Sequence, residues 1–287
     1  MTPDVLDQVT VVVVTYHSAH CLEALDALLA HCPHVVISDN GSRDGTPEQA
    51  RARWPHATVL AHGRNLGFGA ANNRALAATR TPLALLVNPD CEVTPDGLRE
   101  LVQVANAMPE AAIVAPQLEG ASGRPDLNYR WLSTAWASRG PGAEGPVCVG
   151  FVVGAAMLFR LSRFEGVGFF DERFFLYYED DDLCLRLFQQ HRPIVVWPGV
   201  AAVHHARGSV KGKTPWKSEY LRGYHHAQSK LIYTAKHRSH AKARRQRWSV
   251  LLGTTLALPL RAIAWSPRLL ARMAGRWMGL ARWRLHD

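Results

Sequence analysis

The sequence predicts an α/β protein, with a mostly parallel central sheet flanked by helices and a basic helical extension at the C-terminal end. Within about the first ninety residues, four short apolar strands alternate with three helical stretches, the pattern of a parallel sheet with crossover helices. The charge is also divided unevenly. Residues 236–287 hold twelve Lys/Arg and one acid, or +11, so the net charge of +9 leaves the first 235 residues at −2. We therefore expect one domain over residues 1–235 and a basic amphipathic tail over residues 236–287.

The composition is that of a globular protein, because 47% of its 287 residues are hydrophobic and can form a sizeable core. Its five cysteines include no CxxC pair, so neither a disulfide framework nor a zinc ribbon is indicated. The first residues lack the basic and apolar regions of a secretory signal. We expect the protein to reside in the cytoplasm.

The strand expected at residues 83–87 ends abruptly in Asn88, Pro89 and Asp90. Its short apolar run between prolines is typical of a buried central strand, and ligands of open α/β sheets bind at the carboxyl ends of the strands. Asp90 suits a hard divalent cation that also binds phosphate oxygens, although a Pro-Asp pair is equally ordinary turn chemistry.

Two earlier strands end in polar loops of the same kind. Residues 8–15 lead from Thr15 into Tyr16, and residues 35–38 lead into Asp39 and Asn40. An acid after the second strand commonly holds the ribose or base of a nucleotide, whereas the alternative is that Asp39 and Asn40 only shape an Asn-Gly turn. The other expected elements are strands at 58–61, 112–115 and 193–198 and helices at 19–31 and 98–108.

A glycine-containing loop, from Asn65 through Gly67 and Phe68, follows the third strand and precedes an Ala-rich helix. Its glycines permit close backbone approach, and the helix N-terminus would direct amides at a phosphate. The loop matches neither the dinucleotide fingerprint nor the P-loop. A later stretch, residues 119–145, is either a lid whose aromatic residues cover an acceptor or plain irregular surface.

Four consecutive acids, residues 179–182, stand between apolar flanks. Carboxylates are favoured in the first turn of a helix, which is one explanation for the run. The other is that one of them acts as a general base with a pKa tuned by its neighbours. Further on, His204 is either a packed residue or a partner of Asp90 in an Mg²⁺ or Mn²⁺ site, and Arg207, Lys211 and Lys213 are placed to meet a second phosphate.

Together these stretches resemble glycosyltransferase family 2, and within it the rhamnosyltransferase-like branch, over about residues 8–235. The matching pieces are VVTY at 13–16, DNGSRDGT at 39–46, NLGFG at 65–69 with Asn73, NPD at 88–90, GFFDE at 168–172, EDDDL at 179–183, and His204 with Ser209. The resemblance implies a GT-A fold with a Rossmann-like sheet and an inverting transfer from a nucleotide-diphosphate sugar.

The resemblance also implies roles for residues. Asp180 falls on the aspartate that serves as base. Asp90 matches the last position of the metal-binding DxD motif, and His204 matches a late metal-ligand histidine. Thr15, Asp39 and Asn65 match donor-holding positions; the full expected donor set is Thr15, Tyr16, Asp39, Asn40, Asn65, Gly67, Phe68, Asn73 and Asn88. Glu179, Asp181, Arg207 and Lys211 are expected near the acceptor or its phosphates.

Two departures from the family pattern bear on the donor site. His17 stands where Asn is usual, and Asn88 replaces the first DxD aspartate, which leaves one fewer charge for a metal.

The tail indicates a membrane partner. The uncharged run at 248–260 is too short to span a bilayer, which takes about 20 apolar residues. From residue 268 on, Leu269, Met273, Trp277 and Leu280 line one helical face beside arginines, as in a helix lying in the membrane interface. Packing against the domain or a second copy is the alternative. We expect peripheral contact with the inner face of the plasma membrane.

The expected reaction is transfer of a deoxysugar, best matched by L-rhamnose from a dTDP donor, to a lipid-linked or glycan acceptor of a cell-envelope polysaccharide. The alternatives are a UDP-sugar-dependent transferase, such as a galactofuranosyl or other hexosyl transferase, and a sugar-nucleotide-binding protein without catalysis. A nucleotidyltransferase would need a Gly-rich loop with Arg and Lys after the first strand. Nucleic acid is not expected as a partner, because the first 235 residues are slightly acidic.

Overall fold

The computed structural model describes residues 4–127, 129–130, 142–205, 215–263 and 266–284. The chain forms two compact units. Residues 1–170 and 180–211 make the sheet unit, and residues 171–179 and 212–287 make the helical unit. Helix α6 (Pro215–His237) runs across the boundary expected after residue 235. That residues 236–287 act as a separate membrane-binding tail stays a prediction.

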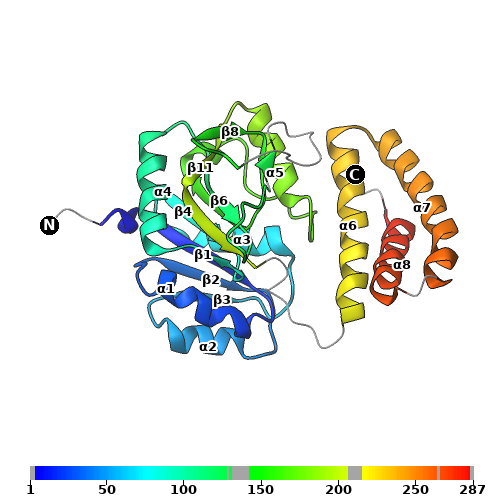
Figure 1. Ribbon diagram of the computed structural model, residues 1–287, viewed down its shortest axis with the longest axis horizontal. Coiled ribbons are helices and arrows are strands. Elements are labelled where there is room, and N and C mark those ends of the chain that lie inside the picture. The colour runs from blue at the N-terminus through cyan, green and yellow to red at the C-terminus, as the bar shows by residue number, and fades with distance from the viewer. Residues whose placement is uncertain (1–3, 128, 131–141, 206–214, 264–265, 285–287) are drawn as a thin grey trace. The chain divides into compact units, whose positions relative to one another are not determined.

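The sheet unit is built on a nine-stranded mixed sheet in the order β3-β2-β1-β4-β10-β6-β11-β5, with β8 paired to β11 (Figure 1). Its strands are β1 Val9–Thr15, β2 Val35–Asp39, β3 Thr58–Ala61, β4 Leu83–Val87, β5 Cys91–Glu92, β6 Ile113–Glu119, β8 Val147–Val149, β10 Ala156–Arg160 and β11 Ile194–His204. Strands β7 Tyr129–Arg130 and β9 Phe151–Val152 form a separate pair. The first four strands in chain order are parallel, as expected, whereas β10 runs antiparallel between β4 and β6.

The helices of this unit are α1 Asp26–Leu29, α2 Thr46–Arg53, α3 Phe68–Ala78, α4 Pro95–Ala107 and α5 Glu179–Gln189, with 3₁₀ helices at Val5–Gln8, Ala19–Leu25 and Leu161–Phe164. The stretch expected as one helix at 19–31 is therefore mostly 3₁₀, although its four leucines are all buried as predicted. Helix α4 begins three residues earlier than expected, because Thr94 caps it through a hydrogen bond from Gly97 N at 3.0 Å and Pro95 opens the first turn.

The sheet is covered on both faces. Val11 and Val13 of β1 pack with helices α1, α2 and α4, whereas Val12 faces the opposite side with α3 and α5. Strand β4 alternates in the same way and is buried along its whole length. The residue period of two in a strand places neighbours on opposite faces, so a continuous apolar run is what a doubly covered strand requires. The expectation of a buried central strand at 83–87 is confirmed.

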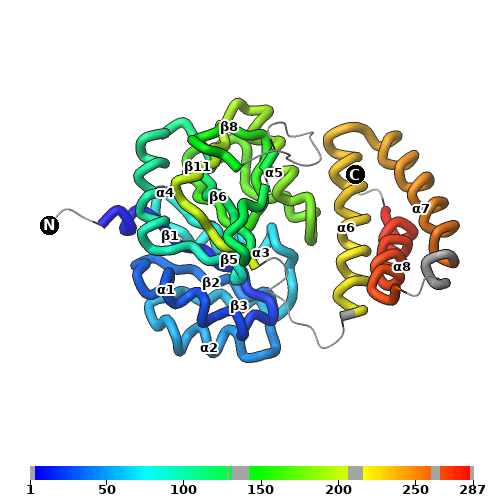
Figure 2. The backbone as a smooth tube through the Cα atoms, viewed as in Figure 1, coloured from blue at the N-terminus to red at the C-terminus, as the bar shows by residue number. Residues whose placement is uncertain are grey.

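The helical unit consists of α6, α7 (His240–Ile263) and α8 (Pro267–Arg282), traced in Figure 2. Helices α6 and α8 approach at backbone contact. A Cβ added at Gly275 would lie 1.9 Å from the Tyr220 carbonyl oxygen, and one at Gly223 would lie 2.0 Å from that of Arg272. Only glycine fits at either position. Among the described residues, no helix combines the length and apolar character needed to cross a bilayer.

The apolar face expected on residues 269–280 is partly buried inside the helical unit. Leu280 is 3% exposed, and the Trp277 indole N–H donates to Thr255 Oγ1 of α7 at 2.9 Å. Helix α8 therefore packs mainly on its neighbours rather than offering that whole face outward.

Candidate active site

The strand ends that carry the candidate residues meet at one edge of the sheet. Strands β1, β2 and β4 are mutually parallel, and β11 runs in the same direction because both β4 and β6 are antiparallel to β10 while β6 and β11 are parallel. Thr15, Asp39, Asn88 and His204 consequently stand at or just beyond the carboxyl ends of their strands. This is the edge where open α/β sheets bind ligands.

Thr15 and Asp39, at the ends of β1 and β2, are joined by a hydrogen bond. The Thr15 hydroxyl donates to Asp39 Oδ1 at 3.0 Å, and the backbone N–H groups of Gly41 and Ser42 donate to Asp39 Oδ2 at 3.2 and 2.9 Å. Asp39 is 1% exposed. Its carboxylate therefore shapes the loop that follows β2, so part of the turn-forming alternative holds for this residue.

Asn40 joins that loop to the glycine loop. Its side-chain amide donates to the Gly67 carbonyl at 3.1 Å, and its Oδ1 accepts from Leu66 N at 2.7 Å. Asn65 Oδ1 in turn accepts from Gly67 N at 2.9 Å. A Cβ at Gly41 would lie 2.7 Å from the Arg64 backbone, so glycine is required where the two loops cross. Asn40, Asn65 and Gly67, three of the residues expected to bind the sugar-nucleotide donor, are thus joined by hydrogen bonds, and we call the two crossing loops the cradle.

Two of the residues expected to bind the sugar-nucleotide donor, Tyr16 and Phe68, are aromatic. The Tyr16 ring contacts the His17 ring edge to face, with centroids 4.4 Å apart. The Phe68 ring lies beside Gly154, where an added Cβ would be 3.4 Å from its Cε1. Phe68 also meets Phe170 edge to face at 6.1 Å. Tyr16 directly follows strand β1, and Phe68 is the first residue of helix α3.

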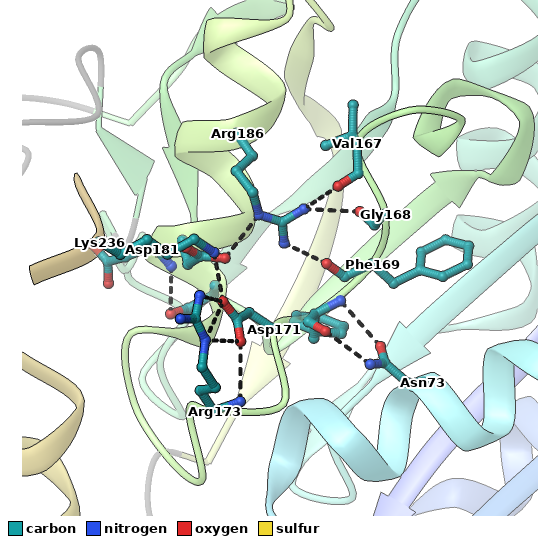
Figure 3. Close-up of polar contacts among 12 residues, drawn as sticks. Asn73, Val167, Gly168, Phe169, Asp171, Arg173, Asp181, Arg186 and Lys236 are labelled. Carbon is teal, nitrogen blue, oxygen red and sulfur yellow. Dashed lines mark hydrogen bonds and ion pairs between the residues drawn. The ribbon is translucent and has the colours of Figure 1, made fainter. Parts of the chain in front are cut away.

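Asn73, on helix α3, binds the backbone of Phe170. Its amide donates to the Phe170 carbonyl at 2.8 Å and its Oδ1 accepts from Phe170 N at 3.1 Å (Figure 3). This pair of bonds clamps the loop before residue 171 to helix α3. That Asn73 also contacts the sugar-nucleotide donor stays a prediction.

Asp90 and His204 come together as expected of a metal pair. Strand β5, next to Asp90, pairs with the end of β11 so that Cys91 stands opposite His204. His204 Nε2 lies 3.8 Å from Asp90 Oδ1, with side chains 16% and 4% exposed. Asn88 begins the same turn, and its N–H donates to the Ala155 carbonyl at 2.9 Å.

This pair fits a divalent cation that takes further ligands from a substrate. A carboxylate oxygen and a neutral imidazole suit Mn²⁺ or Mg²⁺. Within the described ranges, no group of three or more His, Cys, Asp or Glu side chains has metal-binding geometry. Among the described residues, Asp90 and His204 are the pair that could hold such a cation, with phosphate oxygens and water as its further ligands.

Asp180 opens helix α5 and has the environment of a general base. Its Oδ2 accepts from Gly154 N at 3.2 Å and its Oδ1 accepts from Asp181 N at 2.9 Å. Burial, reinforced by the neighbouring Asp181 charge, raises the pKa of Asp180 to about 7, and the two backbone hydrogen bonds and Arg130 oppose that rise. A carboxyl group with a pKa near neutrality is suited to take a proton from a substrate hydroxyl.

Asp180 and the turn that carries Asp90 are connected through two successive residues, Gly154 and Ala155. Gly154 N–H binds Asp180, and the next carbonyl, that of Ala155, binds Asn88 at the head of the turn that carries Asp90. Both interactions lie within the sheet unit. The two distant motifs of the sequence are therefore anchored to one short piece of backbone at the start of β10.

Asp181 and Asp182 are engaged in ion pairs. Asp181 binds Arg130, whose guanidinium also lies 3.7 Å from the Phe151 ring centroid. Asp182 is fully buried and binds Arg186 Nε at 2.8 Å. Arg186 then donates to the carbonyls of residues 167, 168 and 169 (Figure 3). These two acids organise structure around Asp180.

Glu179 ends a segment, residues 171–179, that belongs to the helical unit. Lys236 Nζ lies 2.6 Å from Asp171 Oδ2 (Figure 3), and Ser229 Oγ donates to the Leu176 carbonyl at 2.9 Å. Although burial acts in the other direction, hydrogen bonds from Arg173 and Lys236 hold the pKa of Asp171 well below its usual range. Arg207, Lys211 and Lys213, the expected phosphate contacts, lie outside the described residues.

Three supporting residues lie outside the motifs of the sequence: Arg130, Gly154 and Arg186. Arg130 is one basic residue in a stretch expected to be a loop, and Gly154 lies in an apolar strand-like run. Only Arg186 has a usable pattern, because it stands four residues after Asp182, the spacing of a helical ion pair.

Comparison with known proteins identifies the family to which this chain belongs. The family model described as glycosyl transferase family 2 matches residues 10–164. The chain is 30% identical over 270 residues, covering 81% of this chain and 86% of the relative, to the N-acetylglucosaminyl-diphospho-decaprenol L-rhamnosyltransferase of Mycobacterium tuberculosis. It is 26% identical, with 70% and 68% covered, to the low-salt glycan biosynthesis hexosyltransferase Agl10 of Haloferax volcanii.

Solved structures agree on the fold. The mannosyltransferase PcManGT from Pyrobaculum calidifontis, in complex with GDP-Man and Mn²⁺, superposes with a TM-score of 0.57 at 18% identity, covering 96% of this chain and 86% of that one. Residues 1–349 of S. aureus TarS, in complex with UDP-GlcNAc, give a TM-score of 0.55 at 16% identity, with 96% and 90% covered. The expected GT-A fold is confirmed.

Proposed function

Because this chain belongs to glycosyltransferase family 2, we propose that it transfers L-rhamnose, with inversion, from dTDP-rhamnose to a lipid-linked glycan. The family and the rhamnosyltransferase-like relative make it a glycosyltransferase. The choice of rhamnose is supported by the named relative, which covers most of both chains. The acceptor class we propose, a polyprenyl-diphosphate glycan of the cell envelope, follows from the same relative.

The observation that carries the mechanism is the setting of Asp180. Its carboxylate is held by Gly154 N and Asp181 N, with a pKa of about 7. In the proposed reaction it accepts the proton of the acceptor hydroxyl as that oxygen attacks the anomeric carbon from the side opposite the leaving diphosphate. Attack from the rear gives inversion.

Asp90 and His204 are the residues that would hold a divalent cation, Mg²⁺ or Mn²⁺. When bound, such a cation stabilises the negative charge that collects on a departing diphosphate. Thr15, Asp39, Asn40 and the glycine loop shape the cradle in which we place the nucleotide, with Asn65 and Gly67 setting the approach of the backbone.

Replacing the base tests the proposal directly. The Asp180→Asn substitution preserves size and loses the proton acceptor, so transfer should slow by ~10²–10⁴-fold. Binding of dTDP-rhamnose, measured by calorimetry, should stay within about twofold of wild type because the donor cradle is untouched. Asp96→Asn, on the exposed start of α4, is the matched control. Wild-type rates in Asp180→Asn, or a lost donor affinity, would remove the assignment.

A donor panel separates rhamnose from the alternative sugars. Purified protein is incubated with a polyprenyl-diphosphate-linked N-acetylglucosamine and, separately, dTDP-rhamnose, UDP-hexoses, UDP-galactofuranose or GDP-mannose. We expect product with dTDP-rhamnose. Product with a UDP-sugar alone would favour the hexosyl or galactofuranosyl alternative, and donor binding without product from any sugar would indicate a non-catalytic binding protein.

A further inference from the structure

Helix α7 exposes an apolar stripe that the fold of the helical unit does not use. Trp248, Leu252 and Leu256 follow one another at intervals of four residues and are 62%, 63% and 66% exposed. Residues spaced by four share one helix face. We call these three side chains the α7 stripe. Three large apolar groups in a row are more than the scattered exposed residues of an ordinary surface.

The stripe is not the result of a loosely attached helix. The other side of α7 is committed to the unit, with Ala243 fully buried and Thr254 5% exposed. Arg247 fixes the register of the helix, because its guanidinium donates to the Leu280 and Ala281 carbonyls of α8 at 2.8 and 2.9 Å. The same guanidinium lies 5.2 Å from the Trp248 ring. The stripe is therefore presented by a rigidly packed helix.

Positive charge lies at the N-terminal end of the stripe. Arg244 and Arg245 are exposed on the turn before Trp248, and α7 contains no acidic residue. Across residues 236–287 the chain has twelve Lys/Arg and one acid. A protein partner's apolar patch would not by itself require such an excess of cations, whereas an anionic lipid surface supplies both apolar depth and negative headgroups.

We propose that the α7 stripe docks in the plane of an anionic lipid bilayer, with Arg244 and Arg245 contacting lipid phosphates. This rests on the proposed function, in that a lipid-linked acceptor is presented at such a surface. It moves the membrane contact from α8, where the sequence pattern placed it, to α7. The small exposed residues Ser249, Gly253 and Thr255 beside the stripe allow shallow insertion without a bulky polar side chain in the way.

The test is vesicle flotation of the full-length protein, with vesicles of phosphatidylcholine alone or mixed with phosphatidylglycerol. Wild type should float with the anionic vesicles. The double substitution Leu252→Glu and Leu256→Glu should reduce the bound fraction at least ~10-fold, since it replaces two inserted side chains by charges. Phe188→Glu, at a 48% exposed site on α5, makes the same chemical change elsewhere and should bind like wild type.

A second variant tests the electrostatic part. Arg244→Gln with Arg245→Gln should weaken binding to anionic vesicles by about fivefold per arginine and lower its salt sensitivity. The melting temperature of each variant shows whether it folds, and if the glutamate variant does not fold, the glutamine variant decides. Flotation of both variants at the wild-type level would overturn the proposal, as would a stripe variant that binds vesicles normally but loses a dimer in solution.

Failure of this proposal is distinguishable from failure of the proposed function. Transfer to a short-chain, water-soluble acceptor analogue does not require a bilayer, so it should be the same in wild type and in both α7 variants. If wild type floats but does not use the soluble analogue with any donor, the function is wrong and the docking surface stands. If all variants transfer to the analogue but wild type does not float, the docking surface is wrong and the function stands.

Discussion

The four acids at the start of α5 differ in what surrounds them. Asp181 has Arg130, and Asp182 has Arg186. Asp180 has backbone N–H donors at 2.9 and 3.2 Å and a nearby like charge. Burial, reinforced by the charge of Asp181, raises the pKa of Asp180 to about 7.

This setting predicts the pH dependence of transfer. Below a pH of about 7 Asp180 is protonated and cannot accept a proton, so the turnover rate should fall about tenfold for each further pH unit. Arg130→Met removes a charge that lowers the pKa of Asp180, so it should move this acidic limb to higher pH. The measurement is the pH profile of the turnover rate, and Arg99→Met, at an ion pair on α4, is the control. An unmoved limb in Arg130→Met would contradict the assignment.

The raised pKa of Asp180 also determines how the stability of the fold should change with pH. A carboxyl whose folded-state pKa is raised stabilises the fold at low pH, and this contribution is lost as the pH rises through about 7. Above that pH, Asp180→Asn should melt no lower than wild type. Its loss of activity could then not be ascribed to unfolding.

At the residue scale, the sequence indicated the candidate site residues better than the residues that hold them in place. Asp90, His204 and Asp180 stand in recognisable motifs, and the structure groups them around the start of β10. Arg130 and Gly154 act through long-range contacts that no local pattern encodes. Asn73 was placed with the donor residues because it belongs to a motif, although its bonds go to Phe170.

Among the elements, α5 is tied to the preceding loop by a single arginine. Arg186 binds the fully buried Asp182 and donates to the carbonyls of residues 167–169. The loop has little regular structure of its own, so these hydrogen bonds substitute for a strand or helix ladder. Arg186 is therefore the main polar link between the loop and the helix that carries the base.

Replacing Arg186 should be costly for that reason. Arg186→Met leaves the Asp182 carboxylate buried without its cation, which we expect to lower the free energy of unfolding by ~3–5 kcal/mol. Adding Asp182→Asn to the variant should restore part of the loss, because the remaining buried group is then neutral. Urea denaturation of the two variants and wild type measures both values. Equal stability of the single and double variants would mean that the charge of Asp182 does not matter.

Secondary structure was predicted correctly from the sequence where the hydrophobic pattern matched one type of element. The prediction was wrong where α-helix and 3₁₀ helix share the same pattern. The apolar run of β4 and the β-branched run of β1 were found with bounds accurate to a residue. Residues 19–25 share the leucine spacing of an α-helix yet form a 3₁₀ helix, because both forms bury residues three or four apart.

At the scale of the whole molecule, the candidate site residues lie on strands far apart in the sequence, from β1 near the N-terminus to β11, which ends at residue 204. A ligand that binds across them is stabilised only when the entire sheet is formed. Its binding free energy should therefore add to global stability.

Thermal denaturation can measure this coupling. At about 100 times its Kd, dTDP-rhamnose with Mn²⁺ should add ~2.7 kcal/mol and raise the melting temperature by roughly 5 °C or more. Asp90→Asn and His204→Gln should lose the part of the shift that depends on Mn²⁺. His205→Gln, beside the pair but bound to Glu92, should keep it. An equal Mn²⁺-dependent shift in all three variants would place the cation elsewhere.

At the largest scale, the sequence could predict the order of strands along the chain but not the grouping of residues into units. A change in charge marked residue 235, whereas α6 continues through it to His237. The charge of a segment indicates which partners its surface could bind, not which residues it packs against. The packing of α6 on α8 depends on Gly223 and Gly275, whose role becomes visible only in the folded structure.

The membership of residues 171–179 in the helical unit bears on how shortened forms of this protein should be designed. A fragment ending at residue 164, the limit of the matched family model, would omit Asp180 altogether. One ending at 211 would retain Asp180 but deprive Asp171 of Lys236 and the Leu176 carbonyl of Ser229. A shortened form intended for kinetic measurements must therefore extend at least through α6. The charge distribution alone would have suggested that the chain could be cut at residue 235.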